Sequence, residues 1–360
     1  MPTIYRVHFF NELGKYCKLT VMFERYSATG VENKWEDSLA INFKAVFHKT
    51  MDVGREGAFG IDLLKINYKE YDEIIISSYS SPAEILALCK LKIQRIPYIL
   101  EVDGGIIKNE KYYKKKLKSF LISGADLYFS SSDKTSEYLQ YYGADNSKIY
   151  KYHFTSLFDT DILDDVPSEV EKQELREKLG LYRKKMILAV GQFIHRKGFD
   201  ILLRAIPNLS EDVDIVIVGG KVTKEYQELV RTLEIRNVHF ISEISKDILN
   251  NYYLGADIFV LPTREDIWGL VINEAMAKGL PVITTNCCVA GAELIENNQN
   301  GYIFKSEKVE ELVMYLNELL KDKAMCEKMG NNNLEKIKNY TLEKMAKEHY
   351  EMFKRRNSGE

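Results

Sequence analysis

Two carboxylates, Asp266 and Glu274, stand eight residues apart in the segment 265–285, EDIWGLVINEAMAKGLPVITT. A glycine-centred turn lies between them, and we expect Glu274 to open the helix that follows this turn. Eight residues is too far for one helix face, so we expect a loop acid and a helix acid to approach one ligand from two sides. Carboxylates accept strong hydrogen bonds from hydroxyls. A sugar nucleotide, with hydroxyls on its sugar and on its ribose, would suit such a pair.

The segment 190–205, VGQFIHRKGFDILLRA, could bind phosphate. It reads as a buried strand that ends in Gly191, a short loop, and then Lys197-Gly198 before a helix rich in Leu and Ile. Free backbone amides and the positive end of the helix dipole favour phosphate at such a turn. Lys197 adds a point charge that can meet a diphosphate. The alternative is that Arg196 and Lys197 are ordinary surface cations.

A third acid follows another strand, in EVDGG at 101–105. Ligands of parallel α/β sheets bind at the carboxyl ends of the strands, where Asp103 and Gly104 are expected. Side chains alternate along a strand, so Glu101 and Asp103 share a face and favour a polar pocket wall. The alternative is plain turn chemistry, because Asp-Gly is a common turn pair.

The segment 108–122, KNEKYYKKKLKSFLI, holds six lysines among fifteen residues, together with two tyrosines and a later apolar run. One interpretation is a solvated helix face. The other is an interfacial helix that meets anionic lipid headgroups. The sequence leaves both open.

Composition narrows the class of protein. A chain of 360 residues with 45% apolar residues is expected to form two domains with separate cores. A net charge of −3 argues against a nucleic-acid partner. Five cysteines without metal-ligand spacing indicate free thiols in a reducing cytosol. The scarce, scattered histidines give no metal site, and neither a membrane span nor a signal peptide is recognisable.

Apolar runs rich in β-branched residues alternate with amphipathic segments along the whole chain, which predicts parallel sheets with helices on both faces. The predicted strands are 18–24, 73–78, 98–102, 127–131 and 149–154, and then 185–191, 213–218, 238–241, 257–262, 281–285 and 301–304. We expect a linker at about 155–165 and a helix at 168–179, capped by Ser168 with Glu171. The predicted domains are 1–158 and 165–340, followed by an amphipathic helix at 341–360.

The segment 265–285 resembles the retaining glycosyltransferases of family 4, whose signature is Glu, seven residues, Glu, then Ala-Met-Ala-x-Gly-Leu-Pro-Val. The chain matches it except at the first Glu, where Asp266 stands beside Glu265. The resemblance covers about 185–305. It implies the GT-B fold, with two Rossmann-like domains whose sheets face a central cleft and a final helix that crosses back to the N-terminal domain. Family members usually open with a strand, whereas this chain opens at PTIYRVHFFNEL, so the first strand is expected to be missing.

The resemblance also assigns roles to residues. Lys197 would neutralise the diphosphate, and Arg196 would replace an arginine for which this chain has Gln192. Glu274 would bind the ribose, and Asp266 or Glu265 the transferred sugar. The remaining assignments are the turn at Gly191, ligand-binding backbone amides at Gly269 and Leu270, and the acceptor side at Asp103 and Gly104.

The implied activity is transfer of a hexosyl group, with retention, from a nucleotide sugar to a hydroxyl of a glycan or a polyprenyl-diphosphate-linked saccharide. A UDP-sugar is favoured and a GDP-sugar is the alternative; no metal or other cofactor is expected. Capsule, lipopolysaccharide or exopolysaccharide synthesis would place the protein in the cytoplasm, peripheral on the inner face of the cell membrane through 108–122. The rival hypotheses are a sugar-nucleotide epimerase of GT-B fold and a non-catalytic GT-B binding partner.

Overall fold

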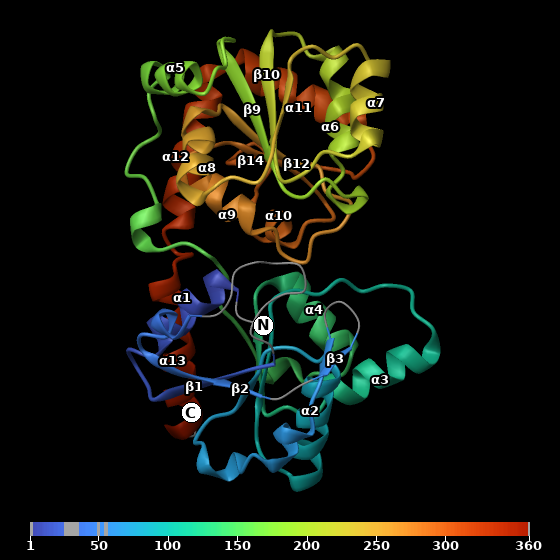
Figure 1. Ribbon diagram of the computed structural model, residues 1–360, viewed down its shortest axis with the longest axis vertical. Coiled ribbons are helices and arrows are strands. Elements are labelled where there is room, and N and C mark those ends of the chain that lie inside the picture. Colours follow the sequence, from blue (N-terminus) through green and yellow to red (C-terminus); the bar gives the residue numbers. More distant parts are fainter. Residues whose placement is uncertain (1–2, 25–35, 49–50, 54–56, 359–360) are drawn as a thin grey trace. The chain divides into compact units, whose positions relative to one another are not determined.

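The computed structural model describes residues 3–24, 36–48, 51–53 and 57–358 (Figure 1). The chain divides into two compact units. Unit 1 is Met1–Ser156 together with Tyr340–Glu360, and unit 2 is Leu157–Asn339. In the described part of the chain, no helix is both long enough and apolar enough to cross a bilayer.

Unit 2 is built on a six-stranded parallel sheet with the order β11-β10-β9-β12-β13-β14. Its strands are β9 (Lys185–Val190), β10 (Val213–Val218), β11 (Val238–Ile241), β12 (Ile258–Leu261), β13 (Val282–Thr285) and β14 (Gly301–Phe304). Every residue of β10, β12 and β13 is buried, as expected for a parallel sheet covered on both faces. All six strands lie in the ranges predicted from the sequence.

Helices cover both faces of this sheet (Figure 1). On one face, Ile187 and Ile215 share a core with α6 (Phe199–Ala205), α7 (Lys224–Thr232) and α11 (Val309–Lys321). On the other face, Tyr253 of α8 packs on Phe259 of β12, with ring centroids 5.8 Å apart. The other α-helices of unit 2 are α5 (Glu169–Lys178), α8 (Lys246–Gly255), α9 (Leu270–Ala277), α10 (Val289–Leu294) and α12 (Lys323–Ile337). The predicted capping box is present, since Ser168 and Glu171 cap α5 reciprocally.

Unit 1 contains a four-stranded parallel sheet with the order β5-β6-β7-β8. Its strands are β5 (Ile75–Ile76), β6 (Ile99–Val102), β7 (Leu127–Ser130) and β8 (Ile149–Lys151), joined by α2 (Pro82–Gln94), α3 (Tyr112–Ile122) and α4 (Asp133–Tyr141). Two further pairs are β1 (Leu19–Phe23) with β2 (Phe43–Phe47), parallel, and β3 (Met51–Val53) with β4 (Gly57–Phe59), antiparallel. The sequence predicted β1 but not β2, β3 or β4.

The first and the last described helices pack together in unit 1. The helix α13 (Leu342–Ser358) packs against α1 (Ile4–Leu13). The buried ring of His349 lies 4.9 Å from that of Phe9 and 4.7 Å from that of Phe129. Arg356 pairs with Glu73 and Asp126 at the far end of the helix. Apolar packing and ion pairs therefore both attach α13 to this unit.

A glycine turn connects β9 to α6 in unit 2. After the short 3-10 segment η6 (His195–Lys197), Gly198 adopts φ +67° and begins α6. A Cβ at Gly198 would lie 2.0 Å from the Pro262 carbonyl oxygen, which is far inside van der Waals contact. The turn therefore needs glycine for its backbone conformation and also for its close approach to the loop after β12.

We predict that Gly198→Ala lowers the free energy of unfolding by roughly 3 kcal/mol or more, because strain at positive φ adds to the steric clash. Gly220→Ala is the matched control. Gly220 has φ +85°, but its Cβ would meet nothing within 4 Å, so only the strain of about 1–2 kcal/mol is expected. Denaturant unfolding of both variants measures the difference. Equal losses would contradict the close packing of Gly198 on Pro262.

Candidate functional site

The loop after β9 carries the two predicted phosphate-binding cations. Gly191 follows β9 with φ +152°, a backbone conformation that residues with a Cβ rarely adopt, and a Cβ there would lie 3.4 Å from Cδ and Cε of Lys197. The stem of Lys197 therefore crosses directly over this glycine. The side chain of Gln192, at the position where the resembling family has an arginine, is exposed. Gly191, Gln192, Arg196 and Lys197 thus lie at the carboxyl end of a central strand.

The structure brings Lys197 and Asp266 into direct contact. Lys197 Nζ lies 2.6 Å from Asp266 Oδ2, and Arg196 Nη1 lies 3.6 Å from Asp266 Oδ1. The Lys197 and Asp266 side chains are only 13% and 11% exposed. One acid of the 265–285 segment and both cations of the 190–205 segment therefore form a single cluster. The Asp266 carboxylate is the acid that both cations contact in this cluster.

Backbone contacts fix this cluster by joining the loops after β9 and β12. The Arg196 carbonyl accepts hydrogen bonds from Thr263 Oγ1 and from the Arg264 amide, both at 2.8 Å. Arg196 Nη1 donates to the Glu265 carbonyl at 2.8 Å. Glu265 therefore contributes its backbone oxygen to the cluster.

Arg264 is a further residue of this site, one that the sequence did not reveal. Its guanidinium binds both carboxylate oxygens of Asp200, at 2.7 and 2.8 Å, and donates to the His195 carbonyl at 2.8 Å. It thereby ties α6, η6 and the loop after β12 together. An arginine beside two acids in a loop gives no sequence signal for this role, because its partner Asp200 lies far away in the chain.

The start of α9 presents open backbone amides beside Asp266. Gly269 precedes the helix with φ +102°, and no side chain of the described residues caps it. A Cβ at Gly269 would lie 2.9 Å from Cys288 Sγ and 3.7 Å from Asp266 Cγ. The first amides of the helix, including that of Leu270, have no partners within the helix, so this end favours an anion.

Trp268, next to this turn, is a packing residue. Its side chain is buried, and its Nε1 donates to Asn273 Oδ1 at 2.9 Å. It therefore supports the start of α9 from the inside of the domain and offers no stacking surface to a ligand.

The prediction that Glu274 begins the helix after the glycine turn is wrong. Glu274 lies one turn inside α9. The helix begins at Leu270 and has no acidic residue in its first turn, because Gly269 already ends the preceding turn. Stabilisation of the helix dipole, which acts within the first turn, therefore does not explain Glu274. Glu274 is partly exposed, and its carboxylate accepts a hydrogen bond from the Tyr253 hydroxyl, 2.9 Å from Oε2. Burial raises the pKa of Glu274 above its ordinary value.

Asp103 lies in unit 1, where it belongs to a largely buried ionic network. Its Oδ1 accepts hydrogen bonds from Arg6 Nη2 at 2.5 Å and from the Tyr152 hydroxyl at 2.8 Å. Arg6 also donates to Glu101 at 2.8 Å, so both acids share a face as predicted. Glu101 is buried and therefore does not line an open pocket. Gly104 follows Asp103 and is partly exposed.

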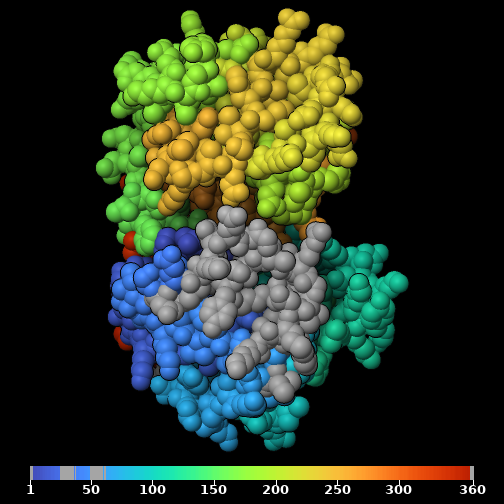
Figure 2. Space-filling model, viewed as in Figure 1, coloured from blue at the N-terminus to red at the C-terminus, as the bar shows by residue number. Residues whose placement is uncertain are grey.

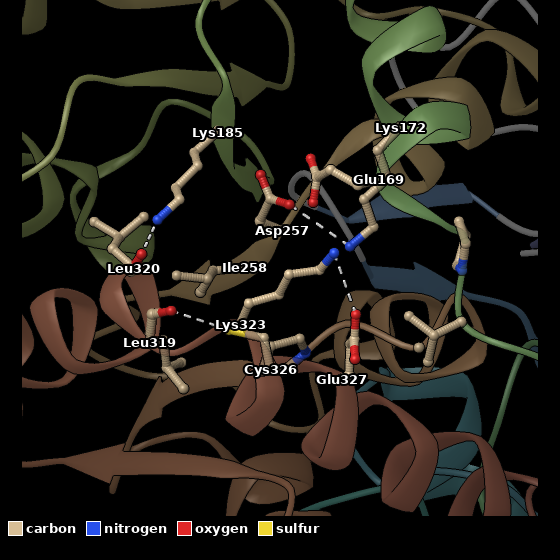
Figure 3. A pocket seen from close by; sticks show the side chains of 14 residues that line it. Glu169, Lys172, Lys185, Asp257, Ile258, Leu319, Leu320, Lys323, Cys326 and Glu327 are labelled. Atoms are coloured by element: carbon tan, nitrogen blue, oxygen red, sulfur yellow. Dashed lines mark hydrogen bonds and ion pairs between the residues drawn. The ribbon is translucent and has the colours of Figure 1, made fainter.

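A hollow of about 80 Å³ lies at the opposite edge of the sheet of unit 2 (Figure 3). It is lined by Lys185 and Ile258, at the amino ends of their strands. Two other lysines that line it face acids of the same hollow: Lys172 lies 3.6 Å from Asp257, and Lys323 lies 3.5 Å from Glu327. Ligands of open α/β sheets bind at the carboxyl ends of the strands, so this hollow is separate from the candidate site. No cluster of His, Cys and acidic residues that could hold a metal ion occurs among the described residues.

The part of the chain that contains the candidate site matches a known protein family. Residues 171–336 match the family described as "Glycosyl transferases group 1". The matched residues lie within unit 2, Leu157–Asn339. The match spans the loop cations, Asp266 and Glu274. Together with relatives that are named as glycosyltransferases, it supports a transferase.

Two relatives illustrate the likeness in sequence. An uncharacterized glycosyltransferase of Haemophilus influenzae is 31% identical over 178 residues, which are 48% of this chain and 50% of that protein. A GDP-mannose-dependent alpha-(1-6)-phosphatidylinositol monomannoside mannosyltransferase of Mycobacterium tuberculosis is 31% identical over 180 residues, 46% of each chain. The chain spans about half the length of the curated relatives it matches.

Solved structures resemble nearly the whole chain. Sucrose-phosphate synthase from Thermosynechococcus elongatus superposes with a TM-score of 0.78 at 16% identity, covering 99% of this chain and 94% of that one. Anabaena Alr3699/HepE in complex with UDP and glucose gives 0.74 at 16% identity, covering 98% and 96%. The fold is GT-B, with two Rossmann-like domains, as the sequence predicted.

We predict that Glu274→Gln stabilises the ligand-free protein at neutral pH. Burial raises the folded-state pKa of Glu274, so wild-type stability falls as pH rises from the ordinary Glu range through that higher pKa. Glutamine still accepts the Tyr253 hydrogen bond and carries no charge. The gain in melting temperature should be absent near pH 4 and full near pH 8, roughly. Glu211→Gln, at an exposed position, is the control. A lower melting temperature of Glu274→Gln near pH 8 would show that the Glu274 charge does not destabilise the folded protein.

Proposed function

We propose that the protein is a retaining glycosyltransferase that moves a hexosyl group from a nucleotide sugar to a hydroxyl of a glycan or lipid-linked acceptor. A UDP-sugar is the favoured donor, and a GDP-sugar is the alternative. The observation that carries the proposal is the cluster in unit 2 in which Lys197 and Arg196 contact Asp266, beside the start of α9, which no described side chain caps. This set of groups suits a departing diphosphate, and the family match covers all of it.

In this proposal the diphosphate lies between the cations and the helix amides. Lys197, Arg196 and the amides of Gly269 and Leu270 would stabilise the negative charge that grows as the sugar bond breaks. Fixed charges and dipoles of this kind can supply the largest part of an enzymatic rate enhancement. This chain's own groups would therefore stabilise the leaving group without a metal ion. The charge of the ligand would compete with Asp266 for Lys197.

The acids would bind the rest of the donor and the acceptor. Glu274 would accept hydrogen bonds from the ribose hydroxyls, and Asp266 or Glu265 would contact the transferred sugar. Asp103, with Gly104, would hold the acceptor hydroxyl. Both hydrogen bonds that the described residues give the Asp103 carboxylate go to Oδ1, which leaves Oδ2 for such a hydroxyl. Retention requires the acceptor to attack from the face that the diphosphate leaves.

The proposed pathway is surface polysaccharide synthesis, as capsule, lipopolysaccharide or exopolysaccharide, on a polyprenyl-diphosphate-linked acceptor at the inner face of the cell membrane. Two similar proteins support this choice by their names. The Mycobacterium relative is named for action on a phosphatidylinositol mannoside. A structural neighbour, WaaG, is described as a glycosyltransferase involved in lipopolysaccharide biosynthesis, with a TM-score of 0.64.

The helix α3 offers a surface for a membrane contact. Figure 2 shows its segment at the periphery of unit 1. Four of its apolar or aromatic side chains are more than half exposed: Tyr112 74%, Tyr113 62%, Leu117 52% and Phe120 53%. Lysines stand among them, including Lys114 and Lys116. Exposed aromatic rings beside cations match the interface of an anionic bilayer, where rings enter the headgroup region and lysines meet the negative charge.

We predict that the protein sediments with vesicles that contain phosphatidylglycerol and not with phosphatidylcholine vesicles. The double change Lys114→Glu and Lys116→Glu should abolish most of this binding, because each lysine near an anionic surface contributes about 1 kcal/mol. The same change at Lys321 and Lys328, exposed lysines of unit 2, is the control. Equal binding of all three proteins would exclude α3 as the lipid-binding surface.

The activity itself is tested by donor turnover. Purified protein is incubated with UDP- and GDP-sugars, and the release of nucleoside diphosphate is measured. We predict release from at least one donor and a loss of about 100-fold or more in Lys197→Ala, the scale seen when one charge-stabilising group is removed. Lys184→Ala, an exposed lysine just before β9 at the opposite end of the strand, should leave the rate unchanged. Full activity of Lys197→Ala would refute the assignment of the phosphate site. Donor conversion to an epimer would favour the epimerase, and no turnover of any donor would favour a binding role.

A further inference from the structure

We infer that Tyr253 is a positioning residue that fixes the Glu274 carboxylate so that the site selects ribonucleotides by their ribose hydroxyls. The inference rests on the proposed function and deepens it. No sequence pattern singled out Tyr253, which lies in α8, 21 residues before Glu274 in the chain. Its role follows from two features of the structure. The Tyr253 hydroxyl contacts Glu274 Oε2, and this contact leaves Glu274 Oε1 available to a ligand.

The Tyr253 side chain is held rigidly. It is 3% exposed, and its ring packs on Phe259 of β12 with centroids 5.8 Å apart. A buried ring between a helix and a sheet places its hydroxyl at one point. That hydroxyl lies 2.9 Å from Glu274 Oε2, and because Tyr253 has the proton, it donates the hydrogen bond. The carboxylate is thus held at one oxygen by the hydroxyl of a buried and packed ring.

The second carboxylate oxygen remains available. Within the described residues, no hydrogen bond reaches Glu274 Oε1, and Glu274 is partly exposed. A carboxylate accepts at two oxygens with about four lone-pair directions. With Oε2 fixed by Tyr253, Oε1 and the remaining lone pair of Oε2 can accept hydrogen bonds from two neighbouring hydroxyls. The 2′ and 3′ hydroxyls of a ribose form such a pair.

The charges around Glu274 agree with a purely accepting role. Lys246 Nζ lies 3.0 Å from the Asp161 carboxylate, and Lys278 Nζ donates to the Asp161 carbonyl at 2.5 Å. Both cations therefore have partners other than Glu274. The Tyr253 hydrogen bond favours the charged form of Glu274, against the burial that raises its pKa. Removing the hydroxyl would leave the carboxylate less well oriented and more easily protonated.

The chain provides a matched control in Tyr252. It precedes Tyr253, is also buried, and lies in the same turn of α8. Tyr252→Phe removes one hydroxyl from the same helix without touching Glu274. A general weakening of α8 would affect both variants, whereas loss of carboxylate positioning would affect only Tyr253→Phe.

The experiment is calorimetric titration of UDP, GDP and their 2′,3′-dideoxy analogues into wild type, Tyr253→Phe, Tyr252→Phe, Glu274→Gln and the double variant Tyr253→Phe/Glu274→Gln. We expect wild type to prefer one of the ribonucleotides over its dideoxy analogue. Tyr253→Phe should reduce this preference about tenfold, the effect of one hydrogen bond to a charged group, and leave the affinity for the analogue unchanged. Tyr252→Phe should match wild type. Tyr253→Phe should add little to Glu274→Gln, because the two residues act through one contact.

The possible results separate this inference from the function on which it rests. If wild type binds a nucleoside diphosphate but does not distinguish its dideoxy analogue, the role of Tyr253 is refuted and the proposed function stands. Equal losses for the ribonucleotide and its analogue in Tyr253→Phe would show a merely structural residue and also refute the inference. If wild type binds neither UDP nor GDP, both the inference and the proposed function fail.

Discussion

The ion pair between Lys197 and Asp266 is the contact on which the site of unit 2 depends. Two strands that are neighbours in the sheet, β9 and β12, each end in a loop, and the pair joins these loops at 2.6 Å. A nearly buried cation and a nearly buried acid must be paired, because either charge alone would lose its solvation without compensation. Arg264 and the Arg196 carbonyl hold the same two loops together, so the pair rests on a rigid frame.

Close backbone approach makes this frame possible. Gly198 lies against the Pro262 carbonyl, and Gly219, after β10, lies so near the Gly191 carbonyl that a Cβ would come within 1.7 Å of its oxygen. Three adjacent strands thus end in loops that pack backbone on backbone. The result is a compact set of cations and amides at one edge of the sheet. At the opposite edge, Lys172 and Lys323 pair with Asp257 and Glu327.

The sequence predicted the strands and loops that follow from local residue patterns. It did not predict the roles of residues that act on partners far away in the chain. Continuous apolar runs revealed all six strands of unit 2, and glycines next to charged residues marked both loops that meet in the site. The roles of Arg264, Tyr253 and Arg6 were not predictable, since each acts on a residue 21 to 97 positions away. The short strands β2, β3 and β4 were not predicted, for a different reason. β3 and β4 span three residues each, too few to show an alternating pattern, and β2, FKAVF, does not alternate between apolar and polar residues along its length.

In the proposed function, the Lys197 cluster binds the diphosphate of a nucleotide. The most direct test is to titrate the protein with a nucleoside, its monophosphate and its diphosphate, using uracil and guanine as the two bases. We predict that affinity rises with each phosphate for one of the bases, and that this rise disappears when Arg196 and Lys197 are both changed to alanine. Equal affinity for the nucleoside and its diphosphate, or a rise that survives the double change, would contradict the claim.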